Sequence, residues 1–321
     1  MIPLPSLPYL APWYRVACEP GKVVLEYAQR IVCLEGGATE RLVPALLPLL
    51  DGRRTLDEVV SALGEPVRPA VELVLRELAE RGLLEAGPPV APDVTLPARG
   101  AAELLASLRP GAAPVSETAE AVDRCVVATI GRGGAGLEAV RLLRSSGVSV
   151  EWADEVAAGV DLALCAPSPD ELPRLPAWNE QALAVRQPWL QVLPFDGRYA
   201  AVGPLYLPGD TCCYECFRLR RGANLGTPDE LALVERAQAA YPTAPALESI
   251  AGGLAAQLTL QWLVLRDHYA PAALYALEPL PTLGLTVHHV HRVPRCGACS
   301  GLTDAAPPLP WFKEVPLAVA G

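Results

Sequence analysis

Two Cys-x-x-Cys pairs constrain the fold of this chain more than any other feature. They are Cys213 with Cys216 and Cys296 with Cys299, and 79 residues separate the two pairs. Each pair presents two thiolates from one tight turn, so the two pairs together supply the four sulfur ligands of a tetrahedral structural Zn²⁺ site. A zinc ion held in this way would act as a staple that ties a late segment of the chain to an earlier one.

Three alternatives to this zinc site remain open. Cys212 could replace Cys213 through a Cys-x-x-x-Cys spacing. A thioredoxin-like redox pair fits poorly, because neither pair is expected to open a helix after a strand near the start of a chain. Chance clustering of buried cysteines is the third. The remaining cysteines lie in apolar, strand-like runs and are expected to be small core residues: Cys18, Cys33, Cys125 and Cys165.

Composition excludes several classes of protein. With 321 residues, 51% hydrophobic and 19% charged, the chain can form about two or three domains with proper cores. A net charge of -10 argues against nucleic-acid binding. No signal peptide is apparent, and no apolar run reaches the roughly 18 residues of a membrane span. We therefore expect a cytoplasmic protein without membrane contact, whose reduced thiols hold metal rather than form disulfides.

Residues 1–88 are predicted to form a separate winged-helix domain. Three strand-like runs, "YRVAC", "KVVLEY" and "RIVCLEG", precede three helical segments. The first helix is expected to end at Gly52, and the second opens with a capping box of Thr55 and Glu58. The third helix ends at Gly82 and places four apolar side chains on one face: Val71, Val74, Leu75 and Leu78.

The charge of this region favours a peptide over DNA as its ligand. Residues 1–90 contain 12 acidic and 9 basic residues, and the third helix carries Glu72, Glu77 and Glu80. A helix that enters a DNA groove needs a basic face. We therefore expect a peptide-binding face here.

Residues 89–118 read as a Pro-rich linker with one short helix, and residues 119–305 as an α/β domain. Gly131, Gly133 and Gly136 match G-x-G-x-x-G between a strand and a helix, and Asp154 follows the second strand at the distance expected of a ribose-binding acid. The alternative is that the glycines only permit a tight turn. Residues 306–321 are a Pro-rich tail.

Later segments add a helix capped by Thr227 with Glu230, a long apolar helix around Gly252, and two late strands. His289 and His291 share one face of the last strand, where surface histidines are commoner than metal ligands.

Taken together, these motifs resemble the E1-like, ThiF-type activating proteins. The segments "GPLYLPGDTCCYEC" and "CGAC", with the glycine turn, are close to the Ocin-ThiF-like branch that serves thiazole/oxazole-modified microcin (TOMM) pathways. The N-terminal region is similar to the PqqD-like RiPP recognition element fused to such proteins. The resemblance implies a winged-helix domain followed by a Rossmann-like domain with a zinc staple. The E1-like part of the resemblance covers roughly residues 120 to 305.

The resemblance carries over residue by residue. It makes Cys213, Cys216, Cys296 and Cys299 the zinc ligands, Gly131, Gly133 and Gly136 the nucleotide loop, and Asp154 the acid after the second strand.

Two features of active family members are missing. Their long insert after that acid, which bears the residues that contact ATP, is absent because Asp161 follows Asp154 within seven residues. Ser168 stands near the place of the Mg²⁺-binding Asp, and Asp170 comes slightly late. Adenylation needs cations aimed at phosphates and a positioned metal. We therefore expect a vestigial loop, no catalytic residue and no bound ATP, with structural Zn²⁺ as the only cofactor.

The resemblance further implies a non-catalytic subunit that binds the leader of a precursor peptide and delivers it to a YcaO-type cyclodehydratase. The leader would add as a strand beside the third strand, against the third helix. This groove comprises Arg30, Ile31, Val32, Cys33, Leu34, Val71, Leu75 and Leu78. Alternatively, most of these side chains form the core of their own domain. The resemblance also allows a homodimer.

Two other functions stay open. One is an active E1-like enzyme that adenylates the C-terminus of a peptide or carrier protein. The other is a winged-helix transcription factor with a metal-sensing domain, against which the acidic third helix counts.

Overall fold

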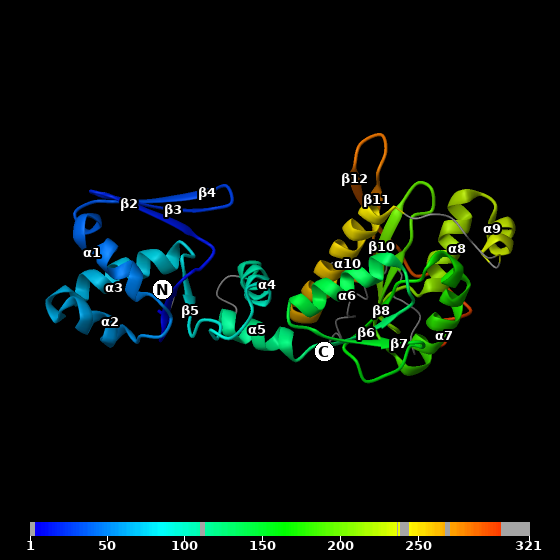
Figure 1. The fold of residues 1–321 in the computed structure, drawn as a ribbon, viewed down its shortest axis with the longest axis horizontal. Helices are drawn as coiled ribbons and strands as arrows, with labels where there is room; N and C mark the ends of the chain where they lie inside the picture. The colour runs from blue at the N-terminus through cyan, green and yellow to red at the C-terminus, as the bar shows by residue number, and fades with distance from the viewer. Residues whose placement is uncertain (1–3, 110–112, 236, 238–243, 267–269, 303–321) are drawn as a thin grey trace, which may run out of the picture. The chain divides into compact units, whose positions relative to one another are not determined.

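The computed structural model describes residues 4–109, 113–235, 237, 244–266 and 270–302 (Figure 1). The chain divides into two compact units. The first contains Met1–Val127, Leu137–Glu151 and Gly252–Asp267, and the second contains Ala128–Gly136, Trp152–Ala251 and His268–Gly321. The predicted domain boundaries at residues 88, 118 and 305 remain predictions, and the tail 306–321 lies outside the described residues.

The N-terminal part of the first unit contains the three predicted strands. They are β2 (Arg15–Glu19), β3 (Lys22–Tyr27) and β4 (Arg30–Glu35), which form an antiparallel sheet in that order. The turn between β2 and β3 contains Gly21 at φ 79°, a left-handed conformation that glycine adopts without strain. A second pair, β1 (Pro8–Leu10) with β5 (Leu84–Ala86), was not predicted from the sequence.

Three helices follow these strands, as predicted. They are α1 (Ala38–Leu46), α2 (Leu56–Leu63) and α3 (Arg68–Glu80), with short 3₁₀ helices at Leu47–Leu49 and Glu65–Val67. The predicted capping box at α2 is confirmed: the Thr55 N–H donates to Glu58 Oε2 at 2.8 Å, and the Glu58 N–H donates to Thr55 Oγ1 at 3.3 Å. Gly52 and Gly82 both have positive φ beyond the helix ends.

The core of this region lies between the helices and one face of the sheet, and Figure 1 shows α1 and α3 on that side of β2–β4. Val23, Leu25 and Val32 from the strands belong to one buried cluster together with helix side chains, including Val71, Leu75 and Leu78. The expectation that the α3 side chains line a peptide groove therefore needs correction. A three-stranded sheet must bury one face, and the apolar stripe of α3 is used for that purpose.

Two helices occupy the predicted linker. The first is α4 (Leu96–Ser107), whose N-terminus is capped by Thr95, as its side chain accepts from the Ala98 N–H at 3.4 Å. The second, α5 (Val115–Asp123), was missed because its sequence is short and polar. The predicted linker, residues 89–118, thus contains one full helix and the start of a second.

The rest of the fold is built on a seven-stranded mixed sheet, whose strands lie in the order β12-β11-β10-β9-β8-β6-β7. Its strands are β6 (Val126–Ile130), β7 (Ser149–Ala153), β8 (Leu162–Cys165), β9 (Trp189–Leu193), β10 (Ala200–Tyr206), β11 (Ala273–Glu278) and β12 (Gly284–His289). β8 pairs parallel with β9, whereas β9 to β12 pair antiparallel. This arrangement is consistent with the Rossmann-like fold that the sequence predicted.

The helices of this part are α6 (Gly134–Ser145), α7 (Leu175–Val185), α8 (Tyr214–Leu225), α9 (Pro228–Val234) and α10 (Pro245–Leu265), with 3₁₀ helices η3 (Pro169–Arg174) and η4 (Ser300–Leu302). α9 begins where predicted, but the Thr227 side chain makes no capping hydrogen bond, so the predicted capping box there is wrong. Among the described residues, no helix has the length and apolarity that crossing a bilayer would need.

Large aromatic side chains fill the core of the second unit. Trp178, Trp189 and Tyr206 are each 1% exposed or less, and the rings of Trp189 and Tyr206 lie 4.4 Å apart. The Tyr206 hydroxyl donates to Gln191 Oε1 at 3.1 Å, which satisfies both buried groups. The same cluster includes all four cysteines of the two Cys-x-x-Cys pairs, so the core and the candidate metal site are continuous.

Replacing Leu75 by Ala tests whether α3 supplies core rather than groove. Leu75 is 1% exposed and Leu73, on the same helix, is 66% exposed. We expect Leu75→Ala to lower the free energy of unfolding by about 2–5 kcal/mol, and Leu73→Ala to change it by less than about 0.5 kcal/mol. Chemical denaturation measures both values, and equal effects would contradict the packing described here.

Candidate functional site

Four cysteines from two distant segments converge in the second unit. Cys213 occupies the N-cap of α8 and Cys216 lies in its first turn, whereas Cys296 and Cys299 lie in the turn before η4. All four side chains are buried, and their sulfur atoms lie within 4.8 Å of one another. The structure thus brings together the four residues that the sequence predicted as metal ligands.

The spacing of the sulfur atoms fits a tetrahedral ion. Cys213 Sγ lies 3.8 Å from the sulfurs of both Cys216 and Cys296, and Cys216 Sγ lies 3.6 Å from that of Cys299. A tetrahedron of sulfurs about 2.3 Å from a central zinc has edges of roughly 3.8 Å. The donor set and its geometry therefore suit a closed structural site.

Backbone and arginine contacts hold the two cysteine segments together around the cluster. The Val293 N–H donates to Cys216 Sγ at 3.3 Å. Arg220 from α8 donates to the carbonyl oxygen of Arg292 at 2.9 Å, and Arg292 donates to that of Gly209 at 3.2 Å. These bonds cross between the segments and orient the ligands without changing their charge.

The electrostatics of the cluster suit a bound cation. Burial raises the pKa of the Cys299 thiol to about 11. A hydrogen bond from the Cys213 thiol holds the pKa of Cys216 below its usual range. Four thiolates in one buried site repel each other unless a positive ion offsets their charge.

The structure bears on each of the alternatives to the zinc site. Cys212 is buried, but its sulfur is not part of the converging set. The Cys213–Cys216 pair opens α8, but far from the start of the chain, and its sulfurs converge with those of the second pair. His289 and His291 are exposed and stand apart from the cluster.

The four remaining cysteines divide between core and surface. Cys125 and Cys165 are buried as expected, whereas Cys18 and Cys33 are exposed. The expectation for these two was wrong, because β2 and β4 are the edge strands of a small sheet that buries only one face.

The glycines of the G-x-G-x-x-G motif allow a close approach between the turn and the end of β8. Gly131 has φ +87°, and a Cβ atom there would lie 2.5 Å from the carbonyl oxygen of Ala166. A Cβ on Gly133 would lie 2.6 Å from the Pro167 oxygen, and one on Gly136 2.6 Å from Ala166 Cβ. The motif is thus needed for packing, whether or not a nucleotide binds.

Carboxylates of the chain itself face this turn. The Arg132 N–H donates to Glu171 Oε2 at 2.7 Å. The Glu248 carboxylate lies against Gly134, in the space that a side chain on that residue would take. The cavity beside Gly133 and Gly134 measures only about 10 Å³, which is about one water molecule. The N-terminal end of α6, where such folds bind phosphate, is therefore filled by anionic side chains.

The remaining residues of the predicted nucleotide site follow the ends of β7 and β8. Asp154 is exposed directly after β7, and β8 begins at Leu162, which confirms the short connection. Ser168 donates to Glu171 at 2.9 Å and serves as the N-cap of η3, while Asp170 is exposed. The sequence singled out these positions but gave no sign of Glu171 or Glu248, which lie far apart along the chain.

The edge of β4 is the other predicted site. Of the described strands, only β3 pairs with β4. Ile31 is 65% exposed and Cys33 is also exposed, whereas Val32 is buried and Leu34 half-buried. Arg30 extends toward the end of α3 and donates to the carbonyl oxygen of Arg81. An open edge with an apolar residue on its outer face remains available to a peptide.

No protein-family model matches this chain, and no curated protein matches it. Solved structures do. A "heterocyclase in complex with substrate and cofactor" is 26% identical, with a TM-score of 0.69, over 92% of this chain and 39% of its own length. The heterocyclase TruD is 27% identical, with a TM-score of 0.68, over 92% of this chain and 43% of its own length.

A third match, MccB from E. coli, is 14% identical with a TM-score of 0.57, over 91% of this chain and 96% of its own length. At this identity, the likeness shows a shared fold. The chain spans about two fifths of the length of the heterocyclases that it resembles. Its fold is thus shared with heterocyclases and with MccB.

Proposed function

We propose that this chain is a recognition subunit of a peptide heterocyclase, without catalytic activity of its own. It binds the leader of a ribosomally made precursor and presents the rest of that peptide to a YcaO-type cyclodehydratase, which forms thiazole or oxazole precursors. The observation that carries the proposal is the likeness to heterocyclases over 92% of this chain. In this proposal the YcaO-type cyclodehydratase carries out the ring-forming step, as the family resemblance implies.

The leader site in this proposal is the open edge of β4, within a winged-helix domain. An added strand gains main-chain hydrogen bonds, and exposed side chains beside the edge choose among leaders. Ile31 and Cys33 are the accessible apolar contacts, whereas Val71, Leu75 and Leu78 support the strand from the core.

The carboxylates at the glycine turn support the absence of adenylation. Glu171 and Glu248 place negative charge where a triphosphate would need backbone N–H groups and cations. We accordingly assign the Rossmann-like part a scaffolding role. A cytoplasmic location remains a prediction from the sequence, and a homodimer remains a prediction from the resemblance.

Zinc is the metal proposed for the cysteine cluster. Four thiolates with tetrahedral spacing and no open position are the ligand set of a structural zinc site rather than a catalytic one. When bound, the ion offsets the charge of the four thiolates. Cys213 and Cys216 hold it from α8, and Cys296 and Cys299 from the later turn.

Metal analysis of the purified chain tests this assignment. We expect close to one zinc ion per chain, lost in Cys296→Ser and retained in Cys212→Ala, because the Cys212 sulfur stands outside the cluster. Zinc should also dissociate as the pH falls, since protons compete for the thiolates. Loss of zinc from Cys212→Ala but not from Cys296→Ser would refute the ligand set.

A labelled leader peptide of the cognate precursor tests the β4 edge. Glutamate at Ile31 would place a charge where the leader buries an apolar side chain, so Ile31→Glu should weaken binding at least about tenfold. The matched control is Val16→Glu on β2, the opposite edge of the same sheet, where Val16 is 41% exposed. Fluorescence anisotropy with the full-length chain measures both. Unchanged binding by Ile31→Glu, or an equal loss with Val16→Glu, would place the leader elsewhere.

A further inference from the structure

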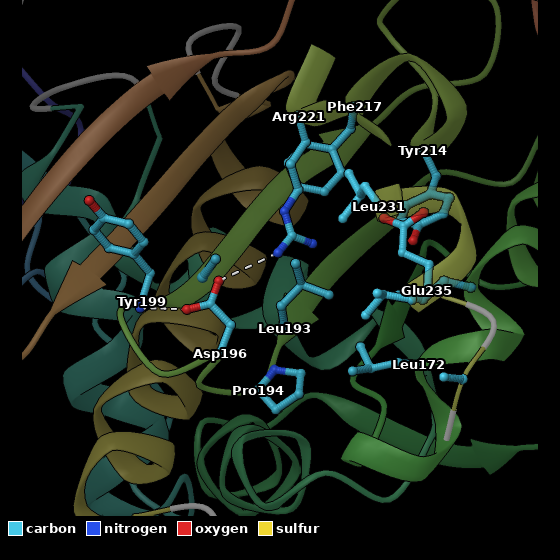
Figure 2. Close-up of a pocket in the computed structure, with 14 residues that line it drawn as sticks. Leu172, Leu193, Pro194, Asp196, Tyr199, Tyr214, Phe217, Arg221, Leu231 and Glu235 are labelled. Carbon is cyan, nitrogen blue, oxygen red and sulfur yellow. Dashed lines mark hydrogen bonds and ion pairs between the residues drawn. The ribbon is translucent and has the colours of Figure 1, made fainter. Parts of the chain in front are cut away.

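A cavity of about 250 Å³ in the second unit has no part in the proposed leader site (Figure 2). Leu172 from η3 and Leu193 at the end of β9 form one wall, and Phe217 from α8 and Leu231 from α9 form the other. η3 and Pro194 follow the carboxyl ends of β8 and β9, the side on which open α/β sheets bind their ligands.

The charged groups around this cavity are already paired. Figure 2 shows Arg221 reaching across to Asp196, and the two lie 3.6 Å apart. Glu235 lies 3.5 Å from Arg218, and burial raises its pKa, which reflects the apolar surroundings. Since Asp196, Arg221 and Glu235 are the charged residues that line the cavity, no lining charge is left without a partner. The cavity therefore favours a neutral apolar group over a phosphate or a free cation.

The apolar surface continues beyond the cavity. Val234 lines the cavity and is 66% exposed, and its neighbour Leu233 on α9 is 65% exposed. A small molecule enclosed by the cavity would leave this surface bare. A longer chain that inserts one side chain would cover the surface next to the mouth as well.

The size of the cavity limits what can enter. Sites for whole cofactors or drug-sized ligands usually measure about 300–1,000 Å³. At about 250 Å³, this one suits a single large side chain such as Trp, Phe or Leu. Tyr214 and Phe217 offer it aromatic edges, and their rings lie 6.1 Å apart.

We propose that this cavity binds one large neutral side chain of the precursor peptide, from the segment that follows the leader. The inference rests on the proposed function for the identity of the peptide. Two contacts on one flexible peptide strengthen each other, because binding of the leader raises the local concentration of the following segment at the cavity. The cavity would thus select precursors by a residue outside their leader.

The first test uses capped amino acids and does not depend on the precursor. Saturation-transfer NMR with the full-length chain should detect N-acetyl-tryptophanamide and N-acetyl-leucinamide but not N-acetyl-glycinamide. Leu231→Trp fills the cavity and should abolish the signal, whereas Leu233→Trp, on the same helix but outside the lining, should keep it. At the exposed mouth, Val234→Asp should likewise weaken the signal and Leu233→Asp should keep it. Neither change disturbs the core.

The second test separates the cavity from the leader site. Leu231→Trp should weaken binding of the complete precursor at least about tenfold and leave binding of the isolated leader unchanged. Ile31→Glu should weaken both. If the leader does not bind at all, the proposed function fails while the amino-acid test still reports on the cavity.

Three results would overturn the inference. The first is equal signals for the tryptophan and glycine probes. The second is an unchanged signal in both Leu231→Trp and Val234→Asp. The third is an affinity for the complete precursor that matches the affinity for the leader in every variant.

Discussion

The convergence of four buried thiols is the constraint on which the rest of the second unit depends. Cys213 and Cys216 begin α8 directly after the loop that follows β10, and Cys296 and Cys299 follow β12. The strands β11 and β12 therefore lie in the chain between the two halves of the cluster. A metal bound at the cluster would fix both ends of this long excursion and stabilise the folded chain, and its charge would offset the cost of gathering four ionisable groups in a core.

Carboxylates of the chain itself face the glycine turn, at the end of the sheet where Rossmann-like folds usually bind a nucleotide. The glycine turn still packs tightly against β8, yet Glu171 and Glu248 supply the anionic groups that face it. A few residues away, beyond the ends of β8 and β9, an apolar cavity with internally paired charges is open. A Rossmann-like fold, which often binds nucleotides, is thus compatible with binding the side chains of a peptide. The open edge of β4 offers main-chain hydrogen-bonding groups to a peptide as well.

The residues that could be predicted are those whose pattern has one physical solution. The four cysteines of the two Cys-x-x-Cys pairs converge in the core, as a shared metal site requires, and Thr55 with Glu58 forms a capping box through contacts within one turn. The apolar face of α3 had two solutions, core or groove, and periodicity alone does not choose between them. In the structure Leu75 lies in the core, because the apolar face of α3 covers the buried face of the sheet. Likewise Cys33 and Cys125 both lie in apolar runs, but only the first is on an edge strand.

Features assembled from distant loops could not be found in the sequence. The cavity joins Leu172, Leu193, Phe217 and Leu231, none of which stands out in its own segment. Glu248 reaches Gly134 only through the tertiary fold.

The most direct test of the whole account measures AMP and pyrophosphate formation by the purified full-length chain with ATP, Mg²⁺ and the cognate precursor. The account predicts that the peptide binds and neither product forms; peptide-dependent AMP release by this chain alone would contradict it.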